Sequence, residues 1–553
     1  EQLAADGFTH MFGNPGTVEQ GLLDELRSVP DLRYVLTLHE TVAVMAADGY
    51  ARAGGRPGLV QLHSSPGLGN AIGALYQARR GHAPLVVLGG DAGIRYQPMD
   101  AQMAGDLVGM ARPVTKWAAM APDASSLLRM LRRAVKVACT PPCGPVYLCL
   151  PQDVMDAACT ERVVPTSIPD TRVSPDETVV AELAARLAAA EHPLILVGDG
   201  VAFSGAQVEL AAVAELVGAE VWDADAGELN LSHAHPCYRG ATGHMFGEQS
   251  LAVTRRADAV LAVGTYLLPE VFPELGEIFA PDAHVAHVDL DPDAIAKNHR
   301  VDLGVVADPK RTLAALAARL ADTMPEAART AARGRVEAMA EARAGARAAE
   351  LAADRERQGR SPLDFAEFAA ALAERLPDDA VIVDEALTNS PALTRYRPPE
   401  VPGSHLLTRG GSLGIGFAIP IGMARAIKDQ LIATGKVARG YLGVSLQDLT
   451  ADLAEAVGTG RSKGALVAEV VPDTPAAKAG LQQGDVIVEL DGKPMDGAGD
   501  VRNTVGMAVA GTSLKIKVLR NGKPVELTAE VGPYPEDGEP GASAAASTSE
   551  KLG

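Results

Sequence analysis

The chain has 553 residues, of which 47% are hydrophobic and only 4% aromatic, so it is large enough for several cores and these must be mainly aliphatic. Its formal net charge of −20 at pH 7 argues against nucleic acid or an anionic membrane as the main partner. No apolar run is long enough for a membrane span, no secretory leader is evident, and five cysteines in this length are typical of a reduced, cytoplasmic protein.

Residues 1–163 alternate short apolar runs with longer helical stretches. The runs predict buried strands at 33–38, 58–62 and 84–88, and the stretches predict helices at 40–53 and 69–79. Strands that alternate with helices in this way form a parallel sheet with helices on both faces. A proline-rich stretch at 164–175 then predicts a linker.

Residues 177–325 repeat the pattern, with strands predicted at 193–197, 220–223, 259–263 and 285–290. The sequence therefore predicts two doubly wound parallel-sheet domains. His233, His235 and His244 fall in what we interpret as a polar loop rather than a metal site. Residues 326–360, rich in Ala, Arg and Glu, predict a charged helical connector.

A third block begins at Ser361 and Pro362, a pair typical of an N-cap and a first helical position. It predicts a helix to residue 376 and strands at 380–384 and 405–408. The pattern then stops at about residue 420, too early to complete a sheet. The fold class is therefore expected to be α/β, with an incomplete third domain at 361–420.

After a linker at 421–436, residues 437–533 change to short strands with Gly-rich turns, which predict a small, mainly-β domain. Asn521 and Gly522, between strands at 514–519 and 525–529, predict a tight hairpin. Residues 534–553 are mostly Pro, Gly, Ala and Ser with charges, and we expect them to be disordered.

Four motifs in the first block carry a family resemblance. They are FGNPGTVE at 12–19, LHE at 38–40, ADGYAR at 47–52 and LHSSPGLGN at 62–70. Together they resemble the pyrimidine-binding domain of thiamine-diphosphate-dependent enzymes of the benzoylformate decarboxylase and acetolactate synthase superfamily, and the resemblance extends to about residue 415. It implies a 2-oxo acid decarboxylase or carboligase that uses thiamine diphosphate with Mg2+ and assembles from two or four copies.

Glu40 is the cofactor-activating acid that the resemblance implies. Thiamine diphosphate must lose a carbon-bound proton to become a nucleophile, and a carboxyl that is hydrogen-bonded to its pyrimidine ring favours the tautomer that takes this proton. Burial between a strand end and an apolar helix is expected to favour the neutral form of Glu40. Taken alone, the residue also fits an acid that the macrodipole stabilises at a helix N-terminus.

The same resemblance assigns other contacts. His63 matches a histidine that faces the substrate carboxylate in benzoylformate decarboxylase, and Thr17 matches a serine that contacts substrate. A hydrogen-bonded histidine at a strand end is the structural alternative for His63. The cofactor-binding residues that the resemblance implies in this domain are Asn14, Pro15, Gly16 and Asn70. The identity of the 2-oxo acid stays open.

The third block resembles the start of a diphosphate-binding domain, which implies cofactor contacts at Glu385, Thr388, Asn389, Gly410 and Gly411. In this family Mg2+ takes oxygen ligands from a Gly-Asp-Gly segment and a later asparagine pair, and the chain has no Asn-Asn pair. Gly-Asp-Gly at 198–200 instead predicts a strand-to-helix glycine turn. We therefore expect no protein ligand set for the metal, and FAD is not expected.

Residues 411–420 (GSLGIGFAIP) also resemble the stretch before the PDZ domain of HtrA-type serine proteases, and motifs at 439–444, 475–481 and 484–487 continue that resemblance. It implies that a peptide C-terminus adds as a strand beside 444–446. The implied contacts are Tyr441, Leu442, Gly443, Val444, Leu446 and Val505. The chain has no Gly-Asn-Ser-Gly-Gly nucleophile loop, so proteolysis is not expected.

These observations leave three functional hypotheses. The chain is a benzoylformate decarboxylase-like enzyme, weakly active or inactive alone because its metal–diphosphate motif is absent, or it is a PDZ scaffold without catalysis, or it is a hybrid with no evolved joint function. The expected partners are a 2-oxo acid, peptide or protein C-termini and further copies of the chain. The enzyme half predicts the cytoplasm, whereas the PDZ half taken alone predicts the cell envelope.

Overall fold

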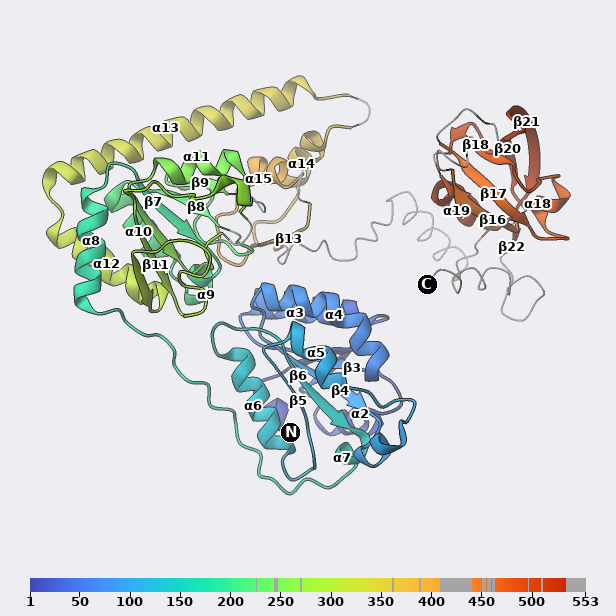
Figure 1. Cartoon of the computed structure of the whole chain (residues 1–553), viewed down its shortest axis with the longest axis horizontal. Coiled ribbons are helices and arrows are strands. Elements are labelled where there is room, and N and C mark those ends of the chain that lie inside the picture. Colours follow the sequence, from blue (N-terminus) through green and yellow to red (C-terminus); the bar gives the residue numbers. More distant parts are fainter. Residues whose placement is uncertain are drawn as a thin grey trace. The chain divides into compact units, whose positions relative to one another are not determined.

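The structure is a computed structural model that describes residues 1–224, 226–242, 247–268, 271–360, 363–386, 389–407, 440–449, 454, 459, 463–495, 497–508 and 511–533. Two compact units make up the chain, Glu1–Ile415 and Gly416–Gly553 (Figure 1). Each unit has hydrophobic cores of its own.

The first sheet has six parallel strands in the order β2-β1-β3-β4-β6-β5, which are β1 (His10–Gly13), β2 (Arg33–Leu36), β3 (Gly58–Leu62), β4 (Leu85–Asp91), β5 (Trp117–Met120) and β6 (Val146–Pro151). One face packs against α3 (Glu40–Gly54), α4 (Ser64–Arg80) and α5 (Leu107–Ala111). The other face packs against α1 (Gln2–Ala5), α2 (Gln20–Glu25), α6 (Leu127–Cys139) and α7 (Gln152–Met155). Successive strand residues face opposite cores, as Leu59 and Val60 do, because side chains alternate along a strand. The predicted parallel sheet with helices on both faces is confirmed.

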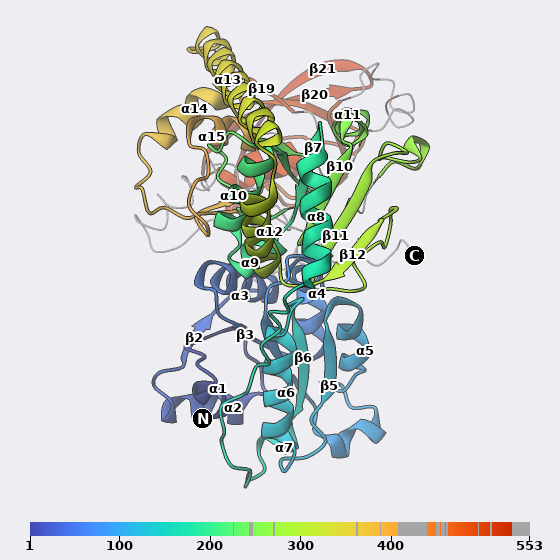
Figure 2. The ribbon, with the colours of Figure 1, turned by 90° about the vertical axis from the view of Figure 1, so that its left-hand side faces the viewer.

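The second sheet is also parallel, in the order β12-β11-β10-β7-β8-β9, with β7 (Pro193–Val197), β8 (Glu220–Asp223), β9 (Tyr238–Ala241), β10 (Ala259–Val263), β11 (His284–Asp289) and β12 (Leu303–Val306). One face packs against α8 (Glu177–Ala189), α9 (Gly200–Ser204), α10 (Gln207–Val217), α12 (Pro309–Thr323) and α13 (Glu326–Glu356), and the other against α11 (Glu248–Arg256). The long connector α13 packs against α10 (Figure 2). The four strands predicted in this block are confirmed, with β11 displaced by one residue.

The Gly-Asp-Gly segment forms the strand-to-helix turn that the sequence predicts. Strand β7 ends at Val197, and α9 begins at Gly200. Asp199 Oδ1 accepts hydrogen bonds from the backbone amides of Gly227 and Glu228 at 2.7 and 2.9 Å. The segment therefore positions a neighbouring loop.

The third block contributes two parallel strands in the described part of the chain, β13 (Ile382–Asp384) and β14 (His405–Leu407), with helices α14 (Phe365–Ala373) and α15 (Ser390–Tyr396). The capping pair predicted at 361–362 lies outside the described residues. Helix α14 begins at Phe365, and its N-cap is Asp364, whose side chain accepts a hydrogen bond from the Ala366 amide. The strand at β13 begins two residues later than predicted, and Val383 within it stays exposed.

The second unit is mainly antiparallel, with the strand order β16-β17-β18-β20-β21. Its elements are β15 (Gly440–Tyr441), β16 (Val444–Asp448), β17 (Ala465–Val470), α18 (Pro475–Lys478), β18 (Val486–Leu490), β19 (Lys493–Pro494), α19 (Ala498–Met507), β20 (Ser513–Arg520), β21 (Lys523–Glu530) and β22 (Gly532–Pro533). Asn521 and Gly522 both have positive φ, 50° and 73°, as a two-residue hairpin turn requires. The predicted hairpin is confirmed.

Arg52 joins three segments of the first unit. From helix α3 its Nε contacts Glu228 Oε1 at 2.6 Å, and its Nη2 donates to the carbonyls of Gly227 at 2.8 Å and Leu407 at 3.1 Å. Asp48, one turn earlier on α3, lies 3.7 Å from Nη1. Burial lowers the pKa of Arg52, but Glu228 and Asp48 raise it by more, so the guanidinium, 8% exposed, stays charged.

We expect Arg52→Gln to destabilise the first unit by about 3–5 kcal/mol, because it leaves buried carboxylates without their cation. Urea unfolding followed by tryptophan fluorescence measures this unit, since Trp117 and Trp222, the two tryptophans of the chain, both lie in it. Arg27→Gln is the matched control, because Arg27 is 86% exposed and pairs only with the exposed Asp24 in the described structure. Equal unfolding midpoints for the two variants would contradict the role given to Arg52.

Candidate functional site

The predicted site residues of the first sheet lie at the ends of three adjacent strands. Asn14 follows β1, Glu40 opens the helix after β2, and His63 follows β3. Strand β1 pairs with β2 on one side and β3 on the other, so the three loops leave the same carboxyl edge of the sheet side by side. A Cβ on Gly67 would lie 3.4 Å from Glu40 Oε1 and 3.6 Å from His63 Cβ, so Glu40 and His63 flank this glycine.

Glu40 is held by two side-chain amides. It is the first residue of α3 and only 6% exposed. Asn14 Nδ2 donates to Oε1 and Asn70 Nδ2 donates to Oε2, both at 2.9 Å. A carboxylate can accept about four hydrogen bonds, so each oxygen keeps capacity for a further donor. The two amides therefore fix the orientation of the carboxylate and leave it able to bind a ligand.

The expectation that burial keeps Glu40 neutral is wrong. Burial raises the pKa of Glu40, but hydrogen bonds from Asn70, from its own backbone amide and from Asn14 together lower it by more. The pKa therefore lies below the ordinary value for a glutamate, and the side chain is ionised at neutral pH. The position also matches the alternative interpretation, because Glu40 is an acid in the first turn of a helix.

His63 forms a buried pair with Glu19, a residue that the sequence analysis did not select. His63 Nδ1 lies 2.9 Å from Glu19 Oε2 and 3.2 Å from Oε1. Glu19 is 1% exposed and also accepts a hydrogen bond from the Gly16 amide at 3.0 Å. Burial raises the pKa of Glu19, and His63 and Gly16 only partly offset this.

The space for this pair depends on two glycines. A Cβ at Gly16 would collide with the His63 ring, and a Cβ at Gly90 would collide with the Glu19 carboxylate. The sequence signal for Glu19 was a single acid in the same loop as Asn14 and Gly16, directly after a buried strand. That signal gives no distance to His63, which is 44 residues away.

The remaining predicted contacts of this domain are more exposed. Pro15 and Thr17 lie exposed in the turn after β1, and Thr17 makes no side-chain hydrogen bond to any described residue. Asn70 is exposed, and its backbone carbonyl accepts a hydrogen bond from Thr41 Oγ1 at 2.6 Å. The structure thus places Asn14, Gly16, Asn70 and His63 around Glu40 and Glu19, with Thr17 at the rim.

In the third block the buried acid is Asp384. It accepts hydrogen bonds from the Ala386 amide and from Ser390 Oγ, both at 2.8 Å, and lies 3.5 Å from His405 Nε2. Glu385 and Asn389 are exposed beyond the end of β13, and no contact between described residues joins them to Glu40. The other predicted contacts, Thr388, Gly410 and Gly411, lie outside the described residues.

No group of three or more His, Cys, Asp or Glu side chains that could hold a metal ion occurs within the ranges that the structure describes. His233 stacks on Tyr238 with ring centroids 4.1 Å apart, and His235 pairs with Glu215 at 3.1 Å. His244 lies outside those ranges. The interpretation of this segment as a polar loop fits both contacts.

In the second unit the residues predicted to bind a peptide lie on and beside the terminal strand of the described sheet. Strand β16 is the terminal strand, and α19 packs against it. The Leu442 carbonyl accepts from the Ala476 amide at 2.8 Å and the Gly443 carbonyl from the Val471 amide at 2.9 Å, so both carbonyls are engaged inside the domain. Gly443 has φ +81°, which glycine adopts readily. Val505 of α19 is buried, whereas Leu446 on β16 is half-buried.

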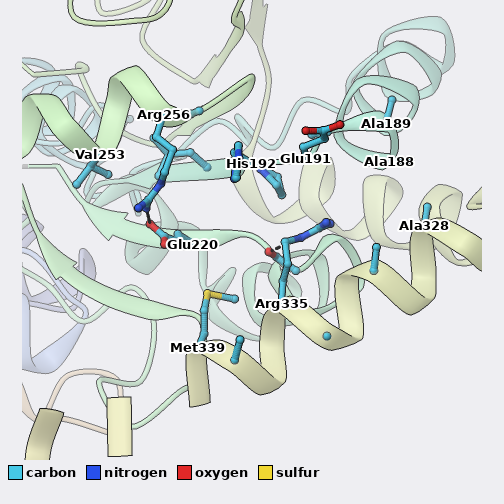
Figure 3. A pocket seen from close by; sticks show the side chains of 18 residues that line it. Ala188, Ala189, Glu191, His192, Glu220, Val253, Arg256, Ala328, Arg335 and Met339 are labelled. Atoms are coloured by element: carbon cyan, nitrogen blue, oxygen red, sulfur yellow. Dashed lines mark hydrogen bonds and ion pairs between the residues drawn. The ribbon is translucent and has the colours of Figure 1, made fainter. Parts of the chain in front are cut away.

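A cavity of about 770 Å³ lies elsewhere, at the amino ends of β7 and β8 beneath α13 (Figure 3). Alanines make up much of its wall, among them Ala188, Ala189 and Ala328. Both of its arginines already have partners: Arg256 pairs with Glu220 at 2.6 Å, and Arg335 donates to backbone carbonyls. This cavity is at the opposite edge from the strand ends that carry catalytic residues in such folds, so it is not the candidate site.

Comparisons with known proteins identify relatives of both units of the chain. Residues 1–110 match the thiamine pyrophosphate enzyme N-terminal TPP binding domain, residues 180–316 match the thiamine pyrophosphate enzyme central domain, and residues 440–531 match the PDZ domain. The chain is 31% identical to benzoylformate decarboxylase of Pseudomonas aeruginosa over 433 residues, which is 76% of each protein. It is 32% identical to acetolactate synthase of Mycobacterium bovis over 57% of this chain, and it spans about half the length (51%) of that synthase.

The C-terminal part has different relatives. It is 45% identical over 150 residues to a DegP-like periplasmic serine endoprotease of Pseudomonas fulva, which is 27% of this chain and 31% of that protein. Among solved structures, a thiamine diphosphate-dependent 4-hydroxybenzoylformate decarboxylase of Rhodococcus jostii superposes with a TM-score of 0.61 at 26% identity, covering 79% of this chain and 78% of that one. Within the described residues no helix has the length and apolar character needed to cross a membrane.

We expect His63→Asn to raise the pKa of Glu19 further, because it removes the group that opposes burial most strongly. The pKa of Glu19 is measured by NMR from the chemical shift of its carboxyl carbon as the pH is changed. A higher pKa gives a larger protonated fraction at a given pH. His82→Asn is the control, because His82 lies outside this pair and contacts the Cys143 carbonyl. An unchanged Glu19 titration in His63→Asn would show that the pair does not couple.

Proposed function

Because this chain belongs to the benzoylformate decarboxylase family of thiamine-diphosphate-dependent enzymes, we propose that it acts on a 2-oxo acid through the ionised carboxylate of Glu40. The observation that carries this proposal is the clamp of Asn14 and Asn70 on a buried acid at the carboxyl edge of the first sheet. A carboxylate fixed in this way is ready to receive a hydrogen bond from a ring nitrogen, because no side chain has to move first.

The residues around Glu40 fit the pyrimidine end of the cofactor. When bound, thiamine diphosphate supplies the nucleophilic carbon that attacks the 2-oxo group. Glu40 would then accept a hydrogen bond from a pyrimidine nitrogen that bears a proton, because its lowered pKa keeps the carboxylate ionised at neutral pH. The proposed roles of Asn14 and Asn70 are therefore to orient this acid, while Pro15 and Gly16 shape the loop beside it.

His63 and Glu19 are proposed to handle the substrate. Glu19 engages His63 Nδ1, so Nε2, which has no partner among the described residues, is the ring nitrogen left for the substrate. A buried carboxylate behind a histidine fixes its tautomer and stabilises its protonated form. Thr17, at the exposed rim of the same loop, is proposed to contact the substrate with its hydroxyl.

The diphosphate end of the cofactor is not matched by the described residues. Glu385 and Asn389 are exposed, no metal-holding group lies within the described ranges, and the sequence contains no Asn-Asn pair. We propose that the metal–diphosphate motif is absent, that the chain alone binds the cofactor weakly, and that an intact partner chain supplies this half. The predicted loss in affinity is at least ~100-fold, or about 2.7 kcal/mol.

Calorimetric titration of thiamine diphosphate with Mg2+ into the chain alone is expected to give a Kd above ~100 µM, since the charged tail has no metal ligands. The benzoylformate decarboxylase of Pseudomonas aeruginosa, titrated in parallel, is the reference. Nanomolar binding by the chain alone would contradict the proposed loss of the motif.

A mixed oligomer tests Glu40 itself. The chain is combined with an intact relative whose own activating glutamate has been replaced by glutamine, and decarboxylation of benzoylformate is measured. We expect the mixture to be active with the natural chain and to lose about 100- to 10,000-fold of this activity with Glu40→Gln, the usual worth of a positioned acid–base group. Equal activity with both forms would remove Glu40 from the mechanism.

The second candidate function is peptide binding without catalysis, and it is favoured by the position of β16, which is the terminal strand of its sheet in the described part of the chain. An added strand would pair with β16, and its terminal carboxylate would meet the amides of Leu442, Gly443 and Val444, next to Tyr441. Leu446 and Val505 would line the pocket for its last side chain. This function requires only the second unit, so it is compatible with a catalytically inactive first unit.

Fluorescence titration with a diverse set of peptides is expected to find saturable binding that is lost on C-terminal amidation. Leu446→Lys is expected to weaken binding at least 10-fold, because it places a charge in an apolar pocket. Leu527→Lys on the opposite terminal strand, β21, is the control, since Leu527 is also half-buried. Saturable binding by no peptide, or equal binding by amidated and free forms, would rule out this mode.

A further inference from the structure

A second polar cavity, of about 500 Å³, lies in the first unit between α13, β9 and α15. In both overall views α15 lies close to the long helix α13 (Figures 1 and 2). Its wall combines apolar groups, Pro391, Pro398, Pro399 and Tyr238, with several charged side chains. The volume is within the usual range of small-molecule sites, about 300–1,000 Å³.

Four arginines line this cavity, and three of them make no ion pair with a described residue. Arg239 is on β9, and Arg343 and Arg347 are one turn apart on α13. Burial lowers the pKa of Arg343, and the nearby charges of Arg239 and Arg347 lower it further. The Nε atom of Arg239 is buried without a hydrogen-bond partner, Arg343 Nη1 donates to the Tyr238 carbonyl at 2.9 Å, and Arg347 is exposed and makes no ion pair with any described residue. Like charges brought together in this way repel one another unless an anion lies between them.

The acids of the cavity already have other partners. Asp223 accepts from Tyr238, Glu228 contacts Arg52, Glu350 pairs with Arg395, and Asp384 accepts from Ser390. None of the four contacts any of the three arginines in the described structure. Within the described residues these three arginines therefore have no acidic partner, whereas Arg395, which also lines the cavity, pairs with Glu350 and Asp354.

A buried histidine adds an unused polar atom. His405, at the start of β14, is 5% exposed and lines the cavity. Its Nε2 faces Asp384 at 3.5 Å, while its Nδ1 is buried without a partner. Leaving such an atom unsatisfied costs about 1–3 kcal/mol, so a polar ligand group or water at this point would be stabilising.

We propose that this cavity binds a small organic molecule with at least two negative charges on phosphate or carboxylate oxygens. Guanidinium groups bind such oxygens in a fixed fork geometry, and three of them around one cavity suit a multivalent anion. The proline wall suits its carbon skeleton. The bound ligand holds α13, β9 and α15 together, and the site is separate from Glu40.

Calorimetry at constant ionic strength tests the site with three probes: pyrophosphate, glucose 6-phosphate and citrate. At least one is expected to bind with 1:1 stoichiometry and a Kd below ~1 mM. Arg239→Gln and Arg347→Gln are each expected to raise the Kd of that probe by about 10-fold or more, which corresponds to the loss of one charge-assisted hydrogen bond. The Kd values of the two phosphate probes and of citrate, compared with one another, identify whether the site prefers phosphate or carboxylate oxygens.

Arg333→Gln is the matched control, because Arg333 is an exposed arginine of the same helix, 14 residues or about 21 Å from Arg347. Its affinity for the probe is expected to equal that of the natural chain, and so is that of Glu40→Gln. Without ligand, Arg347→Gln is expected to unfold at the same temperature as the natural chain or higher, because repulsion is relieved. Binding of no probe, unchanged affinity in Arg347→Gln, or equal loss in Arg333→Gln overturns the proposal.

Discussion

One buried guanidinium connects the parts of the first unit. Arg52 bonds from α3 to the loop that carries Glu228 and to the end of β14, and so links both sheets and the third block. Glu40 is the first residue of the same helix, 12 residues or about 18 Å away. Because a helix is rigid over this length, the position of the candidate acid is tied to the junction between the domains. The desolvation of Arg52 is offset by two carboxylates and two backbone carbonyls, which is what a buried charge requires.

The elements of this fold were predictable because they depend on local patterns. Strands β7, β8 and β10 match their predicted bounds, and the Asn521–Gly522 hairpin follows from the positive φ that both positions need. The motifs selected Glu40 and His63 as candidate residues, and the structure places both at one sheet edge. The start of α14 was harder to predict, because Asp364 takes the capping role three residues after the predicted serine.

The ionisation of Glu40 could not be predicted in the same way. The direction of the Glu40 pKa shift depends on a balance between burial, which raises the pKa, and hydrogen bonds that lower it. Two of these come from the side-chain amides of Asn14 and Asn70, which are 26 and 30 residues away in the chain. The pair of Glu19 and His63 was missed for the same reason, since two loops bring them together. A sequence pattern gives the residue types on each loop, whereas the sign of a pKa shift depends on distances between loops.

In the first unit the acidic candidate site and the arginine-lined cavity lie at different places. Thiamine diphosphate has a cationic ring system and an anionic tail, and the ionised carboxylate of Glu40 at the first sheet suits only the former. Four arginines instead line the cavity between α13 and α15, and three of them make no ion pair with a described residue. In a chain of net charge −20, such a cluster is not explained by overall composition, and screening over about 8 Å confines its attraction to the cavity itself. An anion that binds there is therefore selected by local geometry, and on our proposal it is a different molecule from the one that Glu40 activates.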